Sequence, residues 1–354
     1  MDAAEPLLVL RLMMETGCLE GRDAFRVGLT CTTAMAYFNE MWNTGAFQSP
    51  PDQVLIREPS QFFAVLHPGD DVQAEIIKCA RFPNAALLLL PGDYQIHETL
   101  VINTNVTLFG RNAAMFLFYT INDEEAIAIE SAANNAAFVG INMRGFLGAW
   151  PREPTMSMSD YRVWGLRVVA GAFTVQSCNN MRLPIWLTGA DVRAHIVDCT
   201  FSHAGVSVNY GARATIERTR AESCPHFLDV GHMNSHAIVR DSNLTGDDAI
   251  VYVRNGATLD MARCTLTNAY TCIRFSGADL PNCIIANCTL TTGVATSCIV
   301  IDTWDNEAND DDDEFHDENE PMDHSILPRN LDTNVFMSMD ETVGLNVAAV
   351  EWVD

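Results

Sequence analysis

The stretch that decides the fold runs from residue 185 to residue 201 and reads Ile185-Trp-Leu-Thr-Gly-Ala-Asp-Val-Arg-Ala-His-Ile-Val-Asp-Cys-Thr-Phe201. It contains an alternating apolar segment, a Gly-Ala turn, a second alternating segment and a triplet around a cysteine. The same order returns along the middle of the chain, and the repeats start at Trp164, Ile185, Val206, Leu228, Ile250, Ile273 and Ile299. Successive starts are 21, 21, 22, 22, 23 and 26 residues apart. A fixed period of this length indicates stacked structural units, each of which buries its apolar face only against its neighbours.

Each repeat closes with a small residue in a fixed place. The triplets are Ser177-Cys178-Asn179, Asp198-Cys199-Thr200, Asp241-Ser242-Asn243, Arg263-Cys264-Thr265 and Asn287-Cys288-Thr289, and Thr219 stands near this column in the deviating repeat. Three short strands in a period of about 22 residues are typical of a right-handed parallel β-helix. The L-x-x-L-x-L spacing of leucine-rich repeats is absent. Because equivalent residues of stacked coils lie about 4.8 Å apart, the cysteines and Ser242 are expected to form a buried ladder.

The rest of the chain divides around this repeat. We expect a helical module over 1–45, a linker over 46–66 and a mainly β domain, the right-handed β-helix, over 67–303. A helix over 71–81, with Val72, Ile76, Ile77 and Ala80 on its apolar face, is expected to cap the open end of the stack. Residues 302 to 323 hold twelve carboxylates, which repel one another and predict an acidic disordered loop over 304–328. Residues 329–354 are expected to return as a strand or cap.

Composition excludes several partners. The 354 residues carry 46 acidic and 21 basic side chains, for a formal net charge of -25. This charge disfavours nucleic acid, whose affinity for proteins comes from Lys and Arg, and it also disfavours anionic membranes. The 11 cysteines contain no C-x-x-C pair, and the N-terminus lacks the basic region of a signal peptide. The sequence therefore predicts an intracellular protein, cytoplasmic or nuclear, with no metal, no cofactor and no membrane span.

The first 45 residues resemble an F-box. In that family a short apolar helix is followed by an Asp that opens a second helix with a Val/Leu-x-Cys step and a downstream Trp. The resemblance implies docking on the Skp-type linker of a cullin–RING ubiquitin ligase. The residues that carry it, and that would bind the linker, are Leu10, Leu12, Asp23, Val27, Leu29, Cys31 and Trp42. The usual Leu-Pro opening of the family is missing.

The order of segments extends this resemblance to residue 303. An F-box, a linker, a capping helix and coils with a Cys-Thr-Leu step look like F-box proteins whose substrate domain is a pectin-lyase-like β-helix. Members of that architecture are non-enzymatic adaptors, and the likeness implies a β-helix surface that binds a client protein. A weaker resemblance, around residues 66–71, links the chain to the adenoviral large early-region protein and its capsid-located relatives, which would place it in a host cell.

Two other functions remain open. Gly246-Asp247-Asp248 is similar to the step that supplies acid and base in β-helix polysaccharide hydrolases, which makes Asp247 and Asp248 the catalytic candidates, although the accompanying Gly-His-Gly and Arg-Ile-Lys steps are absent. A lyase would need calcium carboxylates and a basic residue. A structural β-helix, such as a capsid or fibre component, would form a homotrimer where an adaptor is monomeric. Five histidines, His195, His203, His226, His232 and His236, could in principle approach one another and hold a metal.

Overall fold

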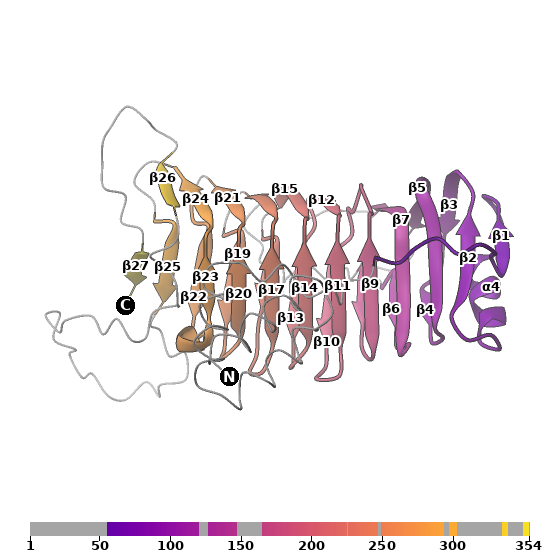
Figure 1. The fold of residues 1–354 in the computed structure, drawn as a ribbon, viewed down its shortest axis with the longest axis horizontal. Helices are drawn as coiled ribbons and strands as arrows, with labels where there is room; N and C mark the ends of the chain where they lie inside the picture. The colour runs from indigo at the N-terminus through magenta and orange to yellow at the C-terminus, as the bar shows by residue number, and fades with distance from the viewer. Residues whose placement is uncertain are drawn as a thin grey trace, which may run out of the picture. The chain divides into compact units, whose positions relative to one another are not determined.

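The computed structural model describes residues 55–119, 127–146, 165–224, 226–246, 249–268, 270–293 and 297–302, together with the backbone of 335–338 and 350–353. The chain divides into two units, Met1–Arg57 and Glu58–Asp354. The second unit is a right-handed parallel β-helix, as the repeat predicts (Figure 1).

One coil shows how the sequence builds the stack. β10 (Ile185–Thr188) lies in a ten-stranded sheet, and a turn at Gly189 leads into β11 (Arg193–Val197) of an eleven-stranded sheet. A tight corner then leads into β12 (Thr200–Ser202) of a six-stranded sheet, and β13 (Val206–Asn209) starts the next coil beside β10. Every strand pairing in the three sheets is parallel, because each strand meets its equivalent one coil later.

The three sheets follow the chain order. The ten-stranded sheet consists of β4 (Leu100–Ile102), β6 (Ile129–Ser131), β8 (Leu166–Val168), β10, β13, β16 (Leu228–Val230), β19 (Val251–Arg254), β22 (Ile273–Ser276), β25 (Ile299–Asp302) and β27 (Val350–Val353). The eleven-stranded sheet consists of β1 (Ala64–Leu66), β2 (Ala85–Leu89), β3 (Gly92–Ile96), β5 (Val106–Tyr119), β7 (Asn135–Phe146), β9 (Ala172–Gln176), β11, β14 (Arg213–Glu217), β17 (His236–Arg240), β20 (Thr258–Ala262) and β23 (Ile284–Ala286). The six-stranded sheet consists of β12, β15 (Arg220–Cys224), β18 (Asn243–Gly246), β21 (Thr265–Asn268), β24 (Thr289–Thr292) and β26 (Val335–Ser338). A 3-10 turn, η2, covers Leu280–Asn282.

The register of the ten-stranded sheet agrees with the repeat starts. Ile185 pairs with Val206 and Val206 with Leu228, and Ile273 pairs with Ile299. The remaining starts are displaced: Val251 takes the place expected for Ile250, and Leu166 takes that of Trp164, which lies outside the described residues. Ile250 and Val251 are both fully buried, so apolarity alone does not set the phase at that position.

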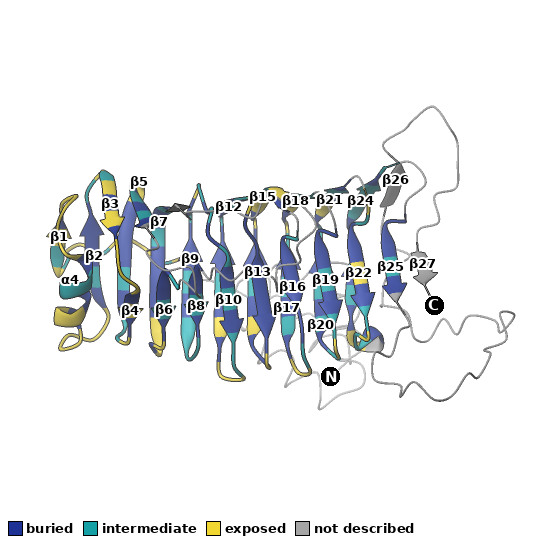
Figure 2. Cartoon of the chain, turned by 180° about the vertical axis from the view of Figure 1, so that it is seen from behind, coloured by how far each residue is buried: buried dark blue, intermediate teal, exposed yellow. Residues whose placement is uncertain are grey.

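Buried residues recur along the strands of all the described coils (Figure 2). Their apolar side chains form rows that fill the interior. Aromatic rings fill the first coils, where Phe138 meets Phe116 and Phe173 edge to face at ring-centroid distances of 6.1 and 5.0 Å. Farther along, the interior positions of the ten-stranded sheet are occupied by aliphatic residues such as Leu187, Val208 and Val230. Burial of these rows accounts for the 48% hydrophobic composition and is the main stabilising contribution to the stack.

The end of the stack carries the expected helix, α4 (Val72–Cys79). The Asp71 carboxylate accepts a hydrogen bond from the Ala74 amide at 2.9 Å and caps the helix. Gln73 bonds both backbone groups of Val101, at 2.7 and 3.1 Å, so its amide replaces a neighbouring strand at the edge of β4. The buried face consists of Val72, Ile76 and Cys79, whereas Ile77 and Ala80, expected on that face, are exposed.

The sequence predicts a linker over 46–66, but the last residues of that segment, in β1, belong to the stack. β1 pairs with β2, and the Phe63 amide donates to the Ala86 carbonyl at 2.8 Å. Phe62 packs edge to face on Phe109 at 5.6 Å, and Glu58 pairs with Arg111. At the other end, β26 and β27 lie within the segment 329–354.

The triplet recurs at the same place in each repeat because it forms the corner between the eleven-stranded and six-stranded sheets. Its first residue has a left-handed backbone in six consecutive coils, with φ between 46° and 55° at Ser177, Asp198, Arg218, Asp241, Arg263 and Asn287. The small residue that follows is buried, and its Sγ or Oγ donates to the carbonyl two residues earlier, at 3.0 Å from Thr219 and 2.7 Å from Ser242. The ladder predicted from Cys178, Cys199, Ser242, Cys264 and Cys288 is therefore present, and Thr219 occupies its missing step.

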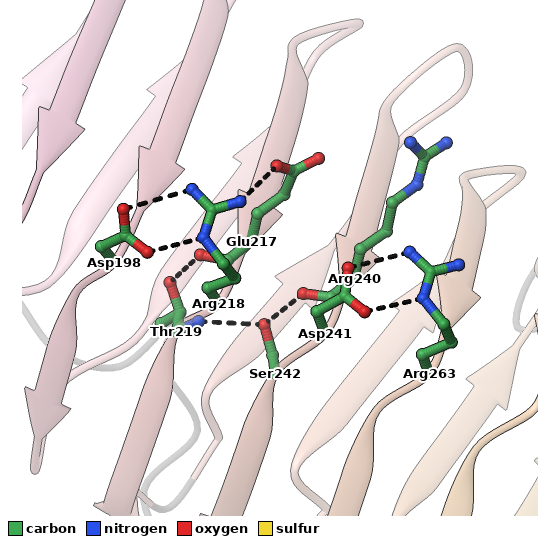
Figure 3. Close-up of polar contacts among 8 residues, drawn as sticks. All are labelled: Asp198, Glu217, Arg218, Thr219, Arg240, Asp241, Ser242 and Arg263. Carbon is green, nitrogen blue, oxygen red and sulfur yellow. Dashed lines mark hydrogen bonds and ion pairs between the residues drawn. The ribbon is translucent and has the colours of Figure 1, made fainter. Parts of the chain in front are cut away.

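The left-handed residues at this corner form ion pairs along the stack. Arg218 binds Asp198 through two hydrogen bonds of 2.7 and 3.2 Å, and Arg263 binds Asp241 at 2.7 and 2.8 Å (Figure 3). Each pair joins neighbouring coils. Because these side chains are substantially exposed, each pair contributes at most about 1 kcal/mol.

Candidate binding surface

The outer side of the ten-stranded sheet carries one outward side chain per coil in a continuous row. We name this side the ten-strand face. Pairing of neighbouring strands places the row members beside one another in the order Val101, Glu130, Arg167, Trp186, Ser207, Asp229, Tyr252, Arg274 and Val300. Ser207 and Asp229, at the centre of the row, are buried, whereas the other members are half-buried or exposed. A row of this length suits contact with another surface better than enclosure of a small molecule.

Asp229, in the middle of the row, forms an ion pair with Arg254, which lies two residues after Tyr252 on β19. Arg254 donates to Asp229 through two hydrogen bonds of 3.1 and 3.0 Å, and the Asp229 side chain is 7% exposed. Burial acts to lower the pKa of Arg254, but Asp229, followed by Tyr252 and Tyr210, raises it above its ordinary value. The guanidinium is therefore held in its charged form and in one orientation.

Aromatic rings flank this ion pair. The guanidinium carbons of Arg254 and Arg274 lie 5.7 and 6.0 Å from the centroid of the Tyr252 ring, within range of a cation–π interaction. Tyr210 stacks on His232 with a centroid distance of 4.0 Å, and 57% of Tyr210 is exposed. We name these six residues the aromatic–arginine cluster: Tyr210, Asp229, His232, Tyr252, Arg254 and Arg274.

A glycine allows the two halves of the cluster to meet. His232 Nδ1 bonds Asn209 Oδ1 at 3.1 Å, and Asn209 Nδ2 donates to Ser207 Oγ at 2.6 Å. A Cβ atom at Gly231 would lie 2.6 Å from Asn209 Oδ1 and 3.3 Å from Arg254 Nε. Because Gly231 has no side chain, the side chains of Asn209 and Arg254 can both pack against its backbone.

The arrangement is suited to binding. Its carboxylate is held by a guanidinium on both oxygens, and its guanidiniums are fixed against rings, so it presents rigid aromatic and cationic surface. Tyr, Trp and Arg are the residue types that contribute most to binding at protein interfaces. Trp186 continues the row next to Ser207, which extends the same chemistry toward the first coils.

The residues predicted for ligase docking and for catalysis lie outside the described residues. This applies to Leu10, Leu12, Asp23, Val27, Leu29, Cys31 and Trp42, and to Asp247 and Asp248. Their assigned roles stay predictions.

The five histidines do not converge. His195 and His236 lie on the eleven-stranded sheet in β11 and β17, His203 is exposed at a turn, and His232 belongs to the cluster. His226 bonds the Ala249 carbonyl through Nδ1 at 2.8 Å. Within the residues that the structure describes, no group of three or more His, Cys, Asp or Glu side chains is placed to hold a metal ion. The nine cysteines of that part are buried free thiols, and no helix in it is long and apolar enough to cross a membrane.

The aromatic–arginine cluster is not among the predicted sites, although its signal is present in the repeat. Trp186, Ser207, Asp229, Tyr252 and Arg274 each occupy the second position of their strand. The first and third positions are apolar and buried, which assigns the second to the outside. Aligning the repeats on that position alone would have shown aromatic and charged residues on consecutive coils.

Comparison with known proteins assigns the chain to no family. No family model and no curated protein matches the chain. A crystal structure of the Dettilon tailspike protein (gp208) is similar with a TM-score of 0.36 and 11% identity, and covers 78% of this chain and 68% of its own. Escherichia coli YbhC matches with a TM-score of 0.21 and 11% identity, over 84% of this chain and 87% of its own. Both likenesses are too distant to carry a functional argument.

Proposed function

We propose that the β-helix is a non-enzymatic protein-binding domain and that the ten-strand face, centred on the aromatic–arginine cluster, contacts its client. The observation that supports this is the fixed placement of Tyr252 between Arg254 and Arg274, beside the stacked Tyr210 and His232. Side chains that are already ordered lose little entropy on binding, so such a cluster favours a stable complex.

The charge of the surface also fits a protein partner. The row contains Glu130, Arg167, Asp229 and Arg274, and Arg254 adds a cation at its edge. The two carboxylates and three guanidiniums nearly cancel in net charge. Such a surface attracts a partner that places single opposite charges against them. Binding to a phosphate backbone requires a strongly basic surface, and these residues do not form one.

The experiment is affinity capture followed by measurement with purified components. A protein recovered with the full-length chain is expressed, and its dissociation constant is measured for wild type and for Tyr252→Ala and Arg274→Ala. We expect each substitution to weaken binding about tenfold or more, the loss of roughly 1.4 kcal/mol that separates hot-spot residues from neutral contacts.

The matched control is Arg263→Ala, which removes an arginine from the corner on another side of the β-helix. Binding of the client should be unchanged in this variant. Equal affinity of wild type, Tyr252→Ala and Arg274→Ala would refute the ten-strand face as the binding surface. Release of reducing ends from a polysaccharide panel, abolished in Asp247→Asn, would instead establish the hydrolase.

The finer proposal is that residues 1–45 connect this domain to the Skp-type linker of a cullin–RING ligase. It rests on the sequence resemblance. Co-purification with the linker should be lost in a Val27→Asp, Leu29→Asp double variant and retained in Tyr252→Ala. Equal recovery of the linker by wild type and the double variant would remove the ligase from the proposal and leave the client surface intact.

A self-assembling structural β-helix is the second candidate, and the fold is equally compatible with it. The observation in its favour is an exposed apolar group at the α4 end, where Phe63, Val65, Ile77 and Phe82 are 37, 50, 63 and 49% exposed. Phe63 and Phe82 lie 4.7 Å apart between ring centroids. Sedimentation distinguishes the candidates, since a stable homotrimer would favour the structural function and a monomer the adaptor.

A further inference from the structure

The outer side of the eleven-stranded sheet carries an excess of cationic groups over β11, β14 and β17. The alternation of these strands places nine side chains on the outer side, namely Arg193, His195, Val197, Arg213, Thr215, Glu217, His236, Ile238 and Arg240. Val197 and Glu217 are fully buried, and the other seven are half-buried or exposed. Three of them are arginines and one is a carboxylate. With neutral imidazoles this surface is positive, in a chain whose formal charge is -25.

Two of these arginines lie directly beside each other. Arg193 pairs in register with Arg213, which pairs with His236 on the next coil. Arg193 and Arg213 are both exposed. Like charges opposite one another on neighbouring strands are unfavourable, and at a spacing of about 4.8 Å they can share one carboxylate placed between them.

No carboxylate among the described residues forms an ion pair with either arginine of this pair. Arg193 donates through one nitrogen to the carbonyls of Ala190 and Val192, both at 2.7 Å, which orders its guanidinium over the turn. In the described part of the chain, Arg213 has no ion pair or side-chain hydrogen bond. Nothing described in the fold therefore accounts for two adjacent guanidiniums.

Arg240 provides a third cation on the same side. It stands beside Glu217 in register, yet its guanidinium extends away from that carboxylate, and no ion pair joins the two (Figure 3). Glu217 instead faces Arg218, with 3.6 Å between Oε2 and Nη1. Arg218 also holds Asp198 through two hydrogen bonds. Glu217 is fully buried, and neither of its carboxylate oxygens has a hydrogen-bond partner. Among the described residues Arg240 has no ion pair, so its guanidinium is left for a partner.

The neighbouring imidazole is also without a partner. His195 lies between the Arg193–Arg213 pair and the corner, on the strand that carries Arg193. Its Nε2 is buried and has no hydrogen-bond partner, and the same holds for both carboxylate oxygens of Glu217 on the neighbouring strand. Buried polar atoms are nearly always satisfied, so the described residues do not supply all the partners of this surface.

We propose that Arg193, Arg213 and Arg240 form a docking surface for an acidic, extended segment of a partner protein. One carboxylate of the segment binds between Arg193 and Arg213, and another reaches Arg240 at the opposite end of the strands. Arginine suits this task, because its planar fork binds carboxylates through two hydrogen bonds. The surface is separate from the ten-strand face, so it can be tested independently of the client proposal.

The test uses the full-length protein and a short fluorescein-labelled peptide of alternating Glu and Ser, in which an extended backbone turns every Glu to one side. Binding is followed by fluorescence anisotropy at low and physiological salt. We expect Arg193→Ala, Arg213→Ala to weaken the affinity about tenfold or more, and added salt to weaken the wild-type complex. Arg274→Ala, on the ten-strand face, should leave it unchanged.

The matched control is Arg218→Ala, Arg263→Ala, which changes the net charge by the same amount but removes arginines that are paired at the corner. Equal weakening by both double variants would show general attraction between charges and overturn the proposal. Tighter binding of a single-stranded oligonucleotide of equal charge would also overturn it. A further variant neutralises residues 310–314 of the acidic run. If it binds the peptide far more tightly than wild type, the chain's own acidic run occupies the surface and the partner proposal fails.

Discussion

Replacing Phe138 by alanine should destabilise the first coils strongly. Phe138 is fully buried, and it pairs in register with Leu108 on one side and Val175 on the other. Its ring also meets Phe116 and Phe173 edge to face. The truncation therefore removes buried apolar surface, leaves a cavity between coils that cannot move together, and breaks two aromatic contacts.

The magnitude follows from these terms. Burial loss and cavity formation together cost about 3–5 kcal/mol for a buried phenylalanine, and each aromatic contact contributes about 0.5–1.5 kcal/mol of such a total. We expect a loss of about 4–5 kcal/mol in the free energy of unfolding. The control is Ile238→Ala, a half-buried outward residue of β17, for which about 1 kcal/mol is expected.

Equilibrium urea unfolding followed by far-ultraviolet circular dichroism measures both variants. Because each coil contacts only its neighbours, amide hydrogen exchange should rise most in β5, β7 and β9 of Phe138→Ala. A loss below about 1.5 kcal/mol, or one equal to that of the Ile238→Ala control, would contradict the packing described for these coils.

Three further outcomes follow from particular residues. Gly205→Ala places a Cβ atom 2.4 and 2.6 Å from the carbonyl oxygens of His226 and Phe227. Thermal unfolding should therefore show a loss of about 1–3 kcal/mol or more in the free energy of unfolding. An unchanged melting temperature would contradict the close approach of these coils. The Cβ atom of Gly231→Ala would meet only side-chain atoms, those of Asn209 and Arg254. This variant should keep the circular dichroism spectrum of the wild type but bind the client more weakly. Full retention of affinity would show that the geometry around Asn209 is unimportant for binding. Burial holds the pKa of His195 below its ordinary value of 6.5, against Glu217 and Asp198, which favour the charged form. The unfolded chain then takes up the proton first, so stability should fall as pH drops below about 6.5. Urea titrations should show a shallower fall for His195→Asn, and identical pH profiles would contradict its burial.

The sequence predicts the coils well because each carries the same physical pattern. Apolar residues alternate with outward ones in the strand that begins at Ile185, a glycine opens the turn at Gly189, and a thiol or hydroxyl follows the corner. The left-handed residue before that thiol is not predictable from its type, since Arg218 and Arg263 occupy it as readily as Asp198. The corner demands a backbone bend, and the buried donor that follows stabilises the bend whichever side chain precedes it.

The surfaces were harder to predict than the interior. Ile77 was expected on the buried face of α4, but the helix turns Cys79 inward and leaves Ile77 exposed. Outward positions are free of the packing constraint that makes interior residues regular, so the aromatic–arginine cluster has no local motif. It becomes visible only when residues about one coil apart, such as Asp229 and Tyr252, are placed side by side.

The most direct test of the ten-strand face is site-specific photo-crosslinking. A photoreactive phenylalanine analogue replaces Trp186, another aromatic residue of the ten-strand face, in one protein and Thr267 on the six-stranded sheet in another, and each is irradiated with the purified client. We expect a cross-linked product from position 186 and none from position 267. Cross-linking from position 267 alone would place the client on the wrong side of the β-helix and contradict the proposal.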